Sequence, residues 1–178
     1  ESLGWSVAAI NTSADGQRLY EKAGLSSLFV GNEGVIVVAD FVTVTKTSKH
    51  FRYVANKARR DQLVVEEWHD LTRDQLSQLR HISRDWLGRA GRREYTFFMG
   101  YFDDTYLRRS RVFVLLQNNK PVGYTNLIPA YAKGKASIDH LRGMDGISTV
   151  GMHFLLSQVI ETLHGEGIKT LYIGLSPL

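Results

Sequence analysis

Apolar positions recur at helical intervals in several segments of the chain. The clearest segment follows Thr72 and Gln75, which form a capping-box pattern, and its apolar residues are spaced three or four apart as far as Leu87. We expect further helices over residues 13–20 and 48–60, from residue 103 or 104 to 109, and from about 148 to 164. Ser13 and Ser48 are suitable caps for the first two of these.

Other segments are rich in β-branched residues or alternate between apolar and polar positions, which is typical of strands. Strands are predicted over residues 27–30, 35–42, 63–68, 111–117, 122–128, 135–142 and 169–175. Asn118 and Asn119 have the composition of a hairpin turn. From residue 63 the order is strand, helix, short helix, hairpin, strand, helix, strand, which indicates an α+β fold with a mixed sheet.

The amino-acid composition excludes several kinds of functional site. The 178 residues include no Cys, which excludes disulfides, thiol nucleophiles and Cys-based zinc sites. The six His residues show no ligand spacing, so we predict no metal. No apolar run approaches the roughly 18 residues of a membrane span. The net charge of +4 favours an anionic partner. Because the chain starts at Glu1 and ends just after a predicted strand, we expect a fragment of a longer protein.

The segment 46–60 is strongly basic. It holds six Lys or Arg residues and one His, and no acidic residue. A helix of this charge can hold phosphates of a nucleic acid or of an anionic membrane. A solvated helix that joins two domains explains the same pattern equally well.

Asp139 lies in the predicted strand 135–142. In a regular strand Ser137, Asp139 and Leu141 share one face, and His140 and Arg142 share the other. A carboxylate in a half-apolar strand needs a partner. Asp139 can hold an amino group or accept a proton, or it is an ordinary surface residue paired with a nearby cation.

A glycine-containing loop leads into the last helix and runs from Arg142 through Gly151 and Met152. In GNAT acetyltransferases a glycine-rich loop at this position holds the pyrophosphate of coenzyme A, since free N–H groups at a helix start bind anions. Here Asp145 stands where the first glycine belongs, so acetyl-coenzyme A is not expected.

An ordered set of short motifs resembles the C-terminal catalytic domain of phosphatidylglycerol lysyltransferases, also called multiple peptide resistance factors. The motifs are GNE (31–33), DWL (85–87), MGYFD (99–103), NLIP (126–129), SIDHLR (137–142), GMHFL (151–155) and YIGLSPL (172–178). The resemblance implies two GNAT-like folds joined by a basic helix. Residues 1–46 would end the first fold, 47–62 would be the basic linker helix, and 63–178 most of the second fold, with a mixed central sheet flanked by helices.

The resemblance also implies an activity. Family enzymes transfer an aminoacyl group, usually lysyl or alanyl, from aminoacyl-tRNA to phosphatidylglycerol, which lowers the negative charge of the membrane. The chain would be a cytoplasmic domain of a bacterial membrane protein, next to an upstream membrane domain, and would need no cofactor. The family motif Asp-x-x-Arg matches Asp139 and Arg142, which become the candidate catalytic residues, with Arg142 on a phosphate.

The candidate substrate-binding residues are Lys49, Arg52, Asn56, Arg60, Asn126 and Ser176. Because Asp139 and Arg142 point to opposite faces of a regular strand, a β-bulge or the strand end must intervene if both line one site. Two alternatives stay open. One is a related aminoacyltransferase with another acceptor, such as a peptidoglycan precursor or a different lipid. The other is a module without catalysis that binds anionic surfaces or tRNA.

Overall fold

The chain divides into two compact units. The computed structural model describes residues 7–177, apart from residues 11, 13, 90, 93, 95–99 and 129–131. One unit comprises residues 1–34 and 175–178, and the other residues 35–174. The expected cap Ser13 lies outside the described residues. The expectation that residues 1–46 end a preceding GNAT-like fold stays a prediction.

One mixed sheet organises the chain, with strand order β1-β6-β5-β4-β3-β2. Its strands are β1 (Gly31–Val37), β2 (Leu63–Trp68), β3 (Arg111–Gln117), β4 (Lys120–Ile128), β5 (Lys135–Gly143) and β6 (Thr170–Pro177). The strands from β2 to β5 pair antiparallel, whereas β5 and β6 pair parallel. The helices are α1 (Ala14–Lys22), α2 (Val38–Thr47), α3 (Lys49–Arg60), α4 (Arg73–Leu87), α5 (Asp104–Arg108) and α6 (Thr149–Gly165). The α+β fold class is therefore confirmed.

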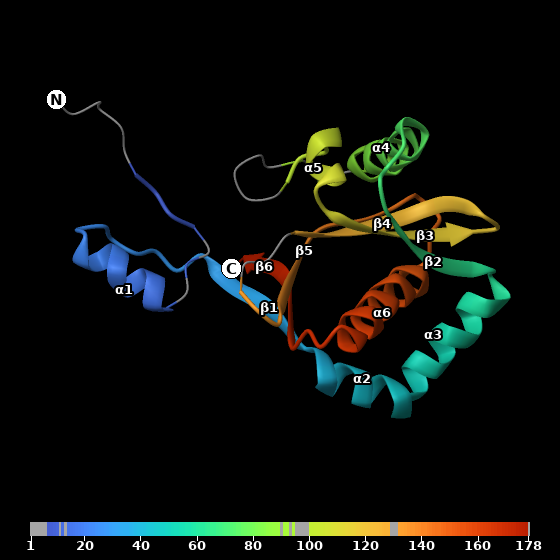
Figure 1. Cartoon of the computed structure of the whole chain (residues 1–178), viewed down its shortest axis with the longest axis horizontal. Helices are drawn as coiled ribbons and strands as arrows, with labels where there is room; N and C mark the ends of the chain where they lie inside the picture. Colours follow the sequence, from blue (N-terminus) through green and yellow to red (C-terminus); the bar gives the residue numbers. More distant parts are fainter. Residues whose placement is uncertain are drawn as a thin grey trace. The chain divides into compact units, whose positions relative to one another are not determined.

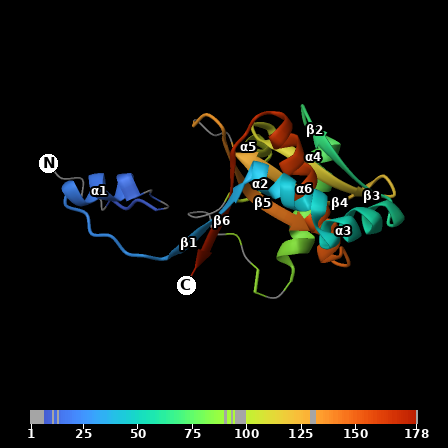
Figure 2. The same cartoon turned by 90° about the horizontal axis from the view of Figure 1, so that it is seen from below.

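Helices cover both faces of this sheet within residues 35–174 (Figure 1). On one face α4 and α5 enclose an apolar cluster that includes Leu79, Leu107 and Tyr124. On the other face α6 packs on the strands, and α2 and α3 pack against α6, as Figure 2 shows from below. The basic helix α3 thus lies on the opposite side of the sheet from α4 and α5.

The strand predicted over 35–42 is wrong beyond Val37, and no strand forms over 27–30. The chain turns helical at Val38 although Val and Thr dominate the segment. Val38 and Val42, four residues apart, are buried against the α6 side of the core. The hydroxyl groups of Thr43 and Thr45 donate to carbonyls within α2. Tertiary burial has overridden the local β preference.

Most other elements agree with the sequence pattern. The capping box of α4 forms as predicted, because the Thr72 hydroxyl accepts from the Gln75 N–H and the Gln75 side chain accepts from the Thr72 N–H. Ser48 caps α3 by accepting from the His50 N–H. None of the described helices has the length and apolar character required to cross a bilayer.

Candidate active site

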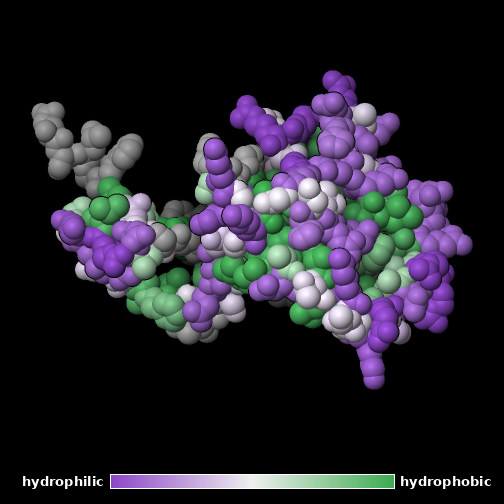
Figure 3. Space-filling model, turned by 60° about the horizontal axis from the view of Figure 1, so that its bottom comes forward, coloured by the Kyte–Doolittle hydropathy of each residue, from purple (hydrophilic) through white to green (hydrophobic). Residues whose placement is uncertain are grey.

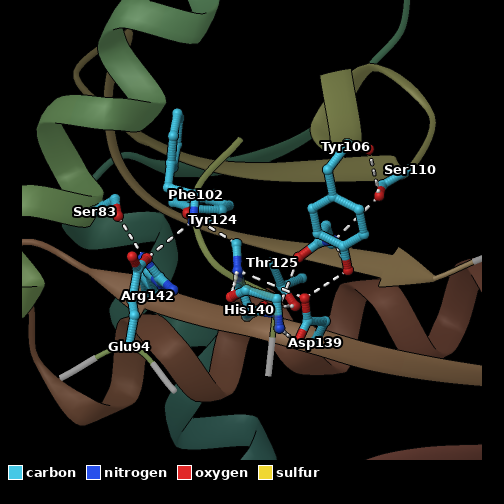
Figure 4. A network of polar contacts seen from close by, with 12 residues as sticks. Ser83, Glu94, Phe102, Tyr106, Ser110, Tyr124, Thr125, Asp139, His140 and Arg142 are labelled. Carbon is cyan, nitrogen blue, oxygen red and sulfur yellow. Dashed lines mark hydrogen bonds and ion pairs between the residues drawn. The ribbon is translucent and has the colours of Figure 1, made fainter. Parts of the chain in front are cut away.

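A β-bulge in β5 brings Asp139 onto the same face as His140 and Arg142. In the β4–β5 ladder Leu127 pairs with Ile138, whereas Thr125 pairs with Leu141. Two steps along β4 therefore match three along β5, and one residue of β5 is extra. The prediction that Asp139 faces away from His140 and Arg142 is wrong for this reason. The condition that a bulge must intervene is met, and Figure 4 shows the resulting cluster.

Side chains of β4 hold the bulge in place. The amide oxygen of Asn126 accepts from the His140 N–H at 2.9 Å, and the hydroxyl of Thr125 donates to the His140 carbonyl at 2.7 Å. Both side chains are completely buried. They replace ladder hydrogen bonds that the bulge removes, so no backbone group of His140 is left unpaired. Asn126, expected to bind substrate, instead holds β5 in this structure.

The carboxylate of Asp139 is held from two directions. Its Oδ2 accepts from the Tyr106 hydroxyl at 2.5 Å, and its Oδ1 accepts from the Gly100 N–H at 2.9 Å. Only 7% of the side chain is exposed, so Asp139 is not an ordinary surface acid. Burial and the hydrogen bond to Asp139 raise the pKa of Tyr106 above its usual range. Tyr106 therefore stays protonated and remains a donor to the carboxylate.

Gly100 contacts Asp139 and His140 through its two backbone groups. Its carbonyl lies 2.5 Å from Nε2 of His140, and because a carbonyl only accepts, Nε2 carries the proton. Nδ1 then accepts from the Tyr124 hydroxyl at 3.2 Å. Burial, followed by the nearby Arg142 guanidinium, lowers the pKa of His140 below its ordinary value. His140 is therefore neutral at neutral pH and orients the Gly100 peptide.

Arg142 is buried and already paired. Its Nη1 donates to the Glu94 carboxylate at 2.7 Å and to the Ser83 hydroxyl, and its guanidinium carbon lies 5.2 Å from the centre of the Trp86 ring. Only 3% of the residue is exposed. The phosphate contact expected for Arg142 is not supported by this geometry, because Glu94 neutralises the charge and the protein shields it. Arg142 instead links β5 to α4 and to the segment that contains Glu94.

The side chain of Asp85 is hydrogen-bonded to the backbone of the loop that precedes α6. Oδ2 of Asp85 in α4 accepts from the Asp145 N–H at 2.6 Å, and Arg89 pairs with the same oxygen. Arg89 also donates to the Gly143 carbonyl. In an acetyltransferase, N–H groups of this loop face a pyrophosphate. Here one of them is taken by Asp85, and the Asp145 side chain adds a second negative charge, so the loop is unsuited to coenzyme A.

The substrate-binding residues predicted on the basic helix lie elsewhere. Lys49, Arg52, Asn56 and Arg60 are exposed along one face of α3, and Figure 3, which turns this side of residues 35–174 forward, shows hydrophilic side chains projecting among apolar patches. The sheet separates α3 from Asp139, so the structure does not bring these residues together with the buried cluster. Ser176 is exposed near the end of β6 and belongs to the other compact unit.

Several residues of the cluster were not predicted as site residues, among them Ser83, Glu94, Gly100, Tyr106 and His140. Gly100 falls within the motif MGYFD, which was a usable signal. Helix α5 positions Tyr106. The side chain of its N-cap residue Asp103 accepts a hydrogen bond from the Tyr106 N–H at 2.8 Å. Nothing in the local sequence indicates that this tyrosine reaches a strand more than thirty residues away.

Comparison with known proteins identifies the family. The sequence profile described as "Phosphatidylglycerol lysyltransferase, C-terminal" matches residues 1–178. The chain belongs to this family. It is 25% identical over 177 residues to the phosphatidylglycerol lysyltransferase of Bacillus subtilis, an alignment that covers 98% of the chain and 20% of that protein. The enzyme of the same name from Staphylococcus xylosus is 30% identical over 184 residues, covering 100% of the chain and 21% of that protein.

Solved structures of the family agree on the fold. The structure of L-PGS from Bacillus licheniformis superposes with a TM-score of 0.78 at 24% identity, over 92% of this chain and 50% of that one. The superposition supports the α+β fold with a mixed central sheet expected from the motifs, and the GNAT-like character of that fold stays a prediction. The chain spans about a fifth of the length of the curated relatives it matches.

Proposed function

We propose that this chain transfers an aminoacyl group, in the first place lysyl, from aminoacyl-tRNA to a hydroxyl group of phosphatidylglycerol. The observation that carries the proposal is the Asp139 carboxylate, which a bulge and two donors hold in a largely buried position. Every aminoacyl ester carries an ammonium group next to its reacting carbonyl. A fixed anion in a low-dielectric setting is a suitable partner for that group.

The geometry favours ammonium binding over proton acceptance for Asp139. Hydrogen bonds from the Gly100 N–H and the Tyr106 hydroxyl fix the orientation of both carboxylate oxygens. A carboxylate has about four lone-pair directions, so about two remain for the protons of an ammonium group. In this role Asp139 orients the ester, and His140, Asn126 and Arg142 act as positioning residues behind it.

The proposed transfer exchanges one ester bond for another. The lipid hydroxyl oxygen bonds to the ester carbonyl carbon, the ribose oxygen of the tRNA leaves, and the proton of the lipid hydroxyl ends on that ribose oxygen. The ester is already activated, so neither ATP nor coenzyme A enters the balance. Positioning two large substrates is the main contribution of the protein.

The basic face of α3 suits docking rather than chemistry. Lys49, Arg52 and Arg60 are exposed, and within the described residues no acid forms an ion pair with them. We assign them to phosphates of the tRNA or of the anionic lipid surface, away from the reacting ester. In the full-length protein, this part would lie on the cytoplasmic side of a bacterial membrane, next to a membrane domain.

Lipid analysis tests the proposal. Cells expressing the full-length protein should accumulate an aminoacylated phosphatidylglycerol on thin-layer chromatography, and cells expressing a version without residues 35–174 should not. If aminoacyl-tRNA is consumed but the lipid profile is unchanged, the aminoacyl group goes to a different acceptor. Salt-sensitive binding of tRNA and anionic vesicles without any consumption of aminoacyl-tRNA would point to the docking module, which the exposed cations of α3 favour as the second candidate.

A further inference from the structure

Two histidines from different helices meet on the α3 side of the sheet. His50 lies in the first turn of α3 and His153 near the start of α6, and Nε2 of His50 is 3.3 Å from Nδ1 of His153. The ring centres are 5.4 Å apart and the rings are inclined by 69°. Both residues are exposed. The transfer reaction proposed above uses neither of them.

The distance between the facing nitrogens fits a long hydrogen bond and also fits a shared metal ion. A hydrogen bond donated by N–H usually spans about 2.7–3.2 Å, so 3.3 Å is long for one. Two imidazole nitrogens bound at about 2.0–2.1 Å to a tetrahedral zinc ion lie about 3.3 Å apart. The same bonds in a square-planar site would bring adjacent nitrogens to about 2.9 Å. The observed separation therefore matches tetrahedral coordination.

We propose that His50 and His153 form a surface binding site for a tetrahedral divalent metal ion of the zinc type. Each neutral imidazole carries one proton, and both facing nitrogens are free for the ion when these protons sit on the outward nitrogens. Binding then requires a change of tautomer and no net loss of a proton. The described residues supply no cluster of three or more metal-binding side chains, so water completes the coordination shell.

The site would link two helices of the same compact unit. An ion shared by His50 and His153 fixes the first turn of the basic helix α3 to the helix that follows β5. The neighbouring Lys49 is exposed and repels a dication, which keeps the affinity modest. Spacing along the sequence gives no sign of the pair, because its members are 103 residues apart.

Calorimetric titration of the 178-residue chain with Zn²⁺ tests the proposal. His50→Ala and His153→Ala should each weaken the binding at least tenfold, and the double variant should bind no more weakly than either single variant. His164→Ala, which removes an exposed histidine from the end of α6, should leave binding unchanged. Lys49→Gln should strengthen it. Zn²⁺ should also raise the unfolding temperature of the wild type and of His164→Ala, but not of His50→Ala.

Two results would overturn the site. One is Zn²⁺ affinity in His50→Ala and His153→Ala within twofold of the wild type, which would place the ion elsewhere. The other is an equal loss in His164→Ala, which would indicate unspecific binding to surface histidines. Thermal unfolding without metal shows whether each variant is folded, so a loss of binding by a folded variant is informative in every case.

Discussion

On the α4 and α5 side of the sheet, Asp139, His140 and Arg142 are largely buried, and each polar group has a partner within the chain. On the α3 side, Lys49 and Arg60 are exposed, and no described acid pairs with them. The first arrangement fixes geometry at the cost of desolvation, whereas the second leaves charge available to a ligand. Substitutions that leave a buried group without its partner should therefore affect folding on the first side, whereas substitutions on the second side should affect binding.

The largest effect is expected for Glu94→Ala, because it leaves the Arg142 guanidinium buried without a carboxylate. We expect the free energy of unfolding to fall by about 3 kcal/mol, the lower end of the range for a broken buried pair, since Glu94 is partly exposed. Urea denaturation measures this value. Adding Arg142→Met should restore part of the loss. A change below about 1 kcal/mol in Glu94→Ala would show that the pair does not matter for folding.

Gly100→Ala should have the next largest effect. A Cβ atom at Gly100 would lie 2.0 Å from Oδ2 of Asp139 and 2.9 Å from Cε1 of Tyr106, so the carboxylate must move. We expect a loss of about 2 kcal/mol in unfolding free energy, as for overpacked sites, together with a loss of aminoacyl-lipid formation. Gly165→Ala is the matched control, because nothing lies within 4 Å of its Cβ position. Equal behaviour of the two variants would contradict the described contact.

The pH dependence of stability tests the neutral state of His140. Its pKa is lowered in the folded chain, whereas in the unfolded chain it takes the ordinary value of about 6.5. Below pH 6.5 the unfolded chain binds a proton that the folded chain does not. Stability should therefore be lost as the pH falls below 6.5, by at most about 1.4 kcal/mol per pH unit. Unfolding curves between pH 8 and pH 5 should show less of this loss for His140→Gln than for His164→Gln; identical slopes would contradict the assignment.

The smallest effect on stability is expected on the basic helix. Lys49→Ala, Arg52→Ala and Arg60→Ala should each change the unfolding free energy by less than about 0.5 kcal/mol. Each should nevertheless weaken tRNA or anionic-vesicle binding and reduce its salt dependence by about one charge. Lys57→Ala is the internal control, because Lys57 is bound to Asp61 at 2.7 Å. If Lys57→Ala weakened binding as much as the three variants of exposed residues, the total charge of the helix and not its exposed face would explain the binding.

The sequence correctly predicted turns and helix caps that depend on contacts between neighbouring residues. The hairpin at Asn118 and Asn119 forms with positive φ angles of 51° and 61°, as a tight turn between twisted strands requires. The capping box of α4 and the cap of α3 also form where the residues indicate them. In each case the deciding contacts lie within a few residues of one another.

The parts that were predicted wrongly depend on distant contacts. The segment from Val38 to Thr47 is rich in β-branched residues, yet it forms a helix that buries Val38 and Val42 and packs against α6. Regular alternation placed Asp139 on the wrong face because the bulge is set by Asn126 and Thr125 on the neighbouring strand. The contact partners of Gly100 and Glu94 could not be inferred, since the β5 residues that they bind are about forty or more positions away in the sequence.

The central claim is that the charge of Asp139 holds the aminoacyl group. Asp139→Asn keeps the size of the side chain, and the Tyr106 hydroxyl can rotate to accept from the new amide, so the fold should survive. The decisive measurement is the rate of lysyl-phosphatidylglycerol formation by the full-length protein carrying Asp139→Asn. We predict at least a hundredfold decrease, about 2.7 kcal/mol of lost transition-state stabilisation, with an unfolding temperature close to that of the wild type. A rate within twofold of the wild type in a folded protein would contradict the account.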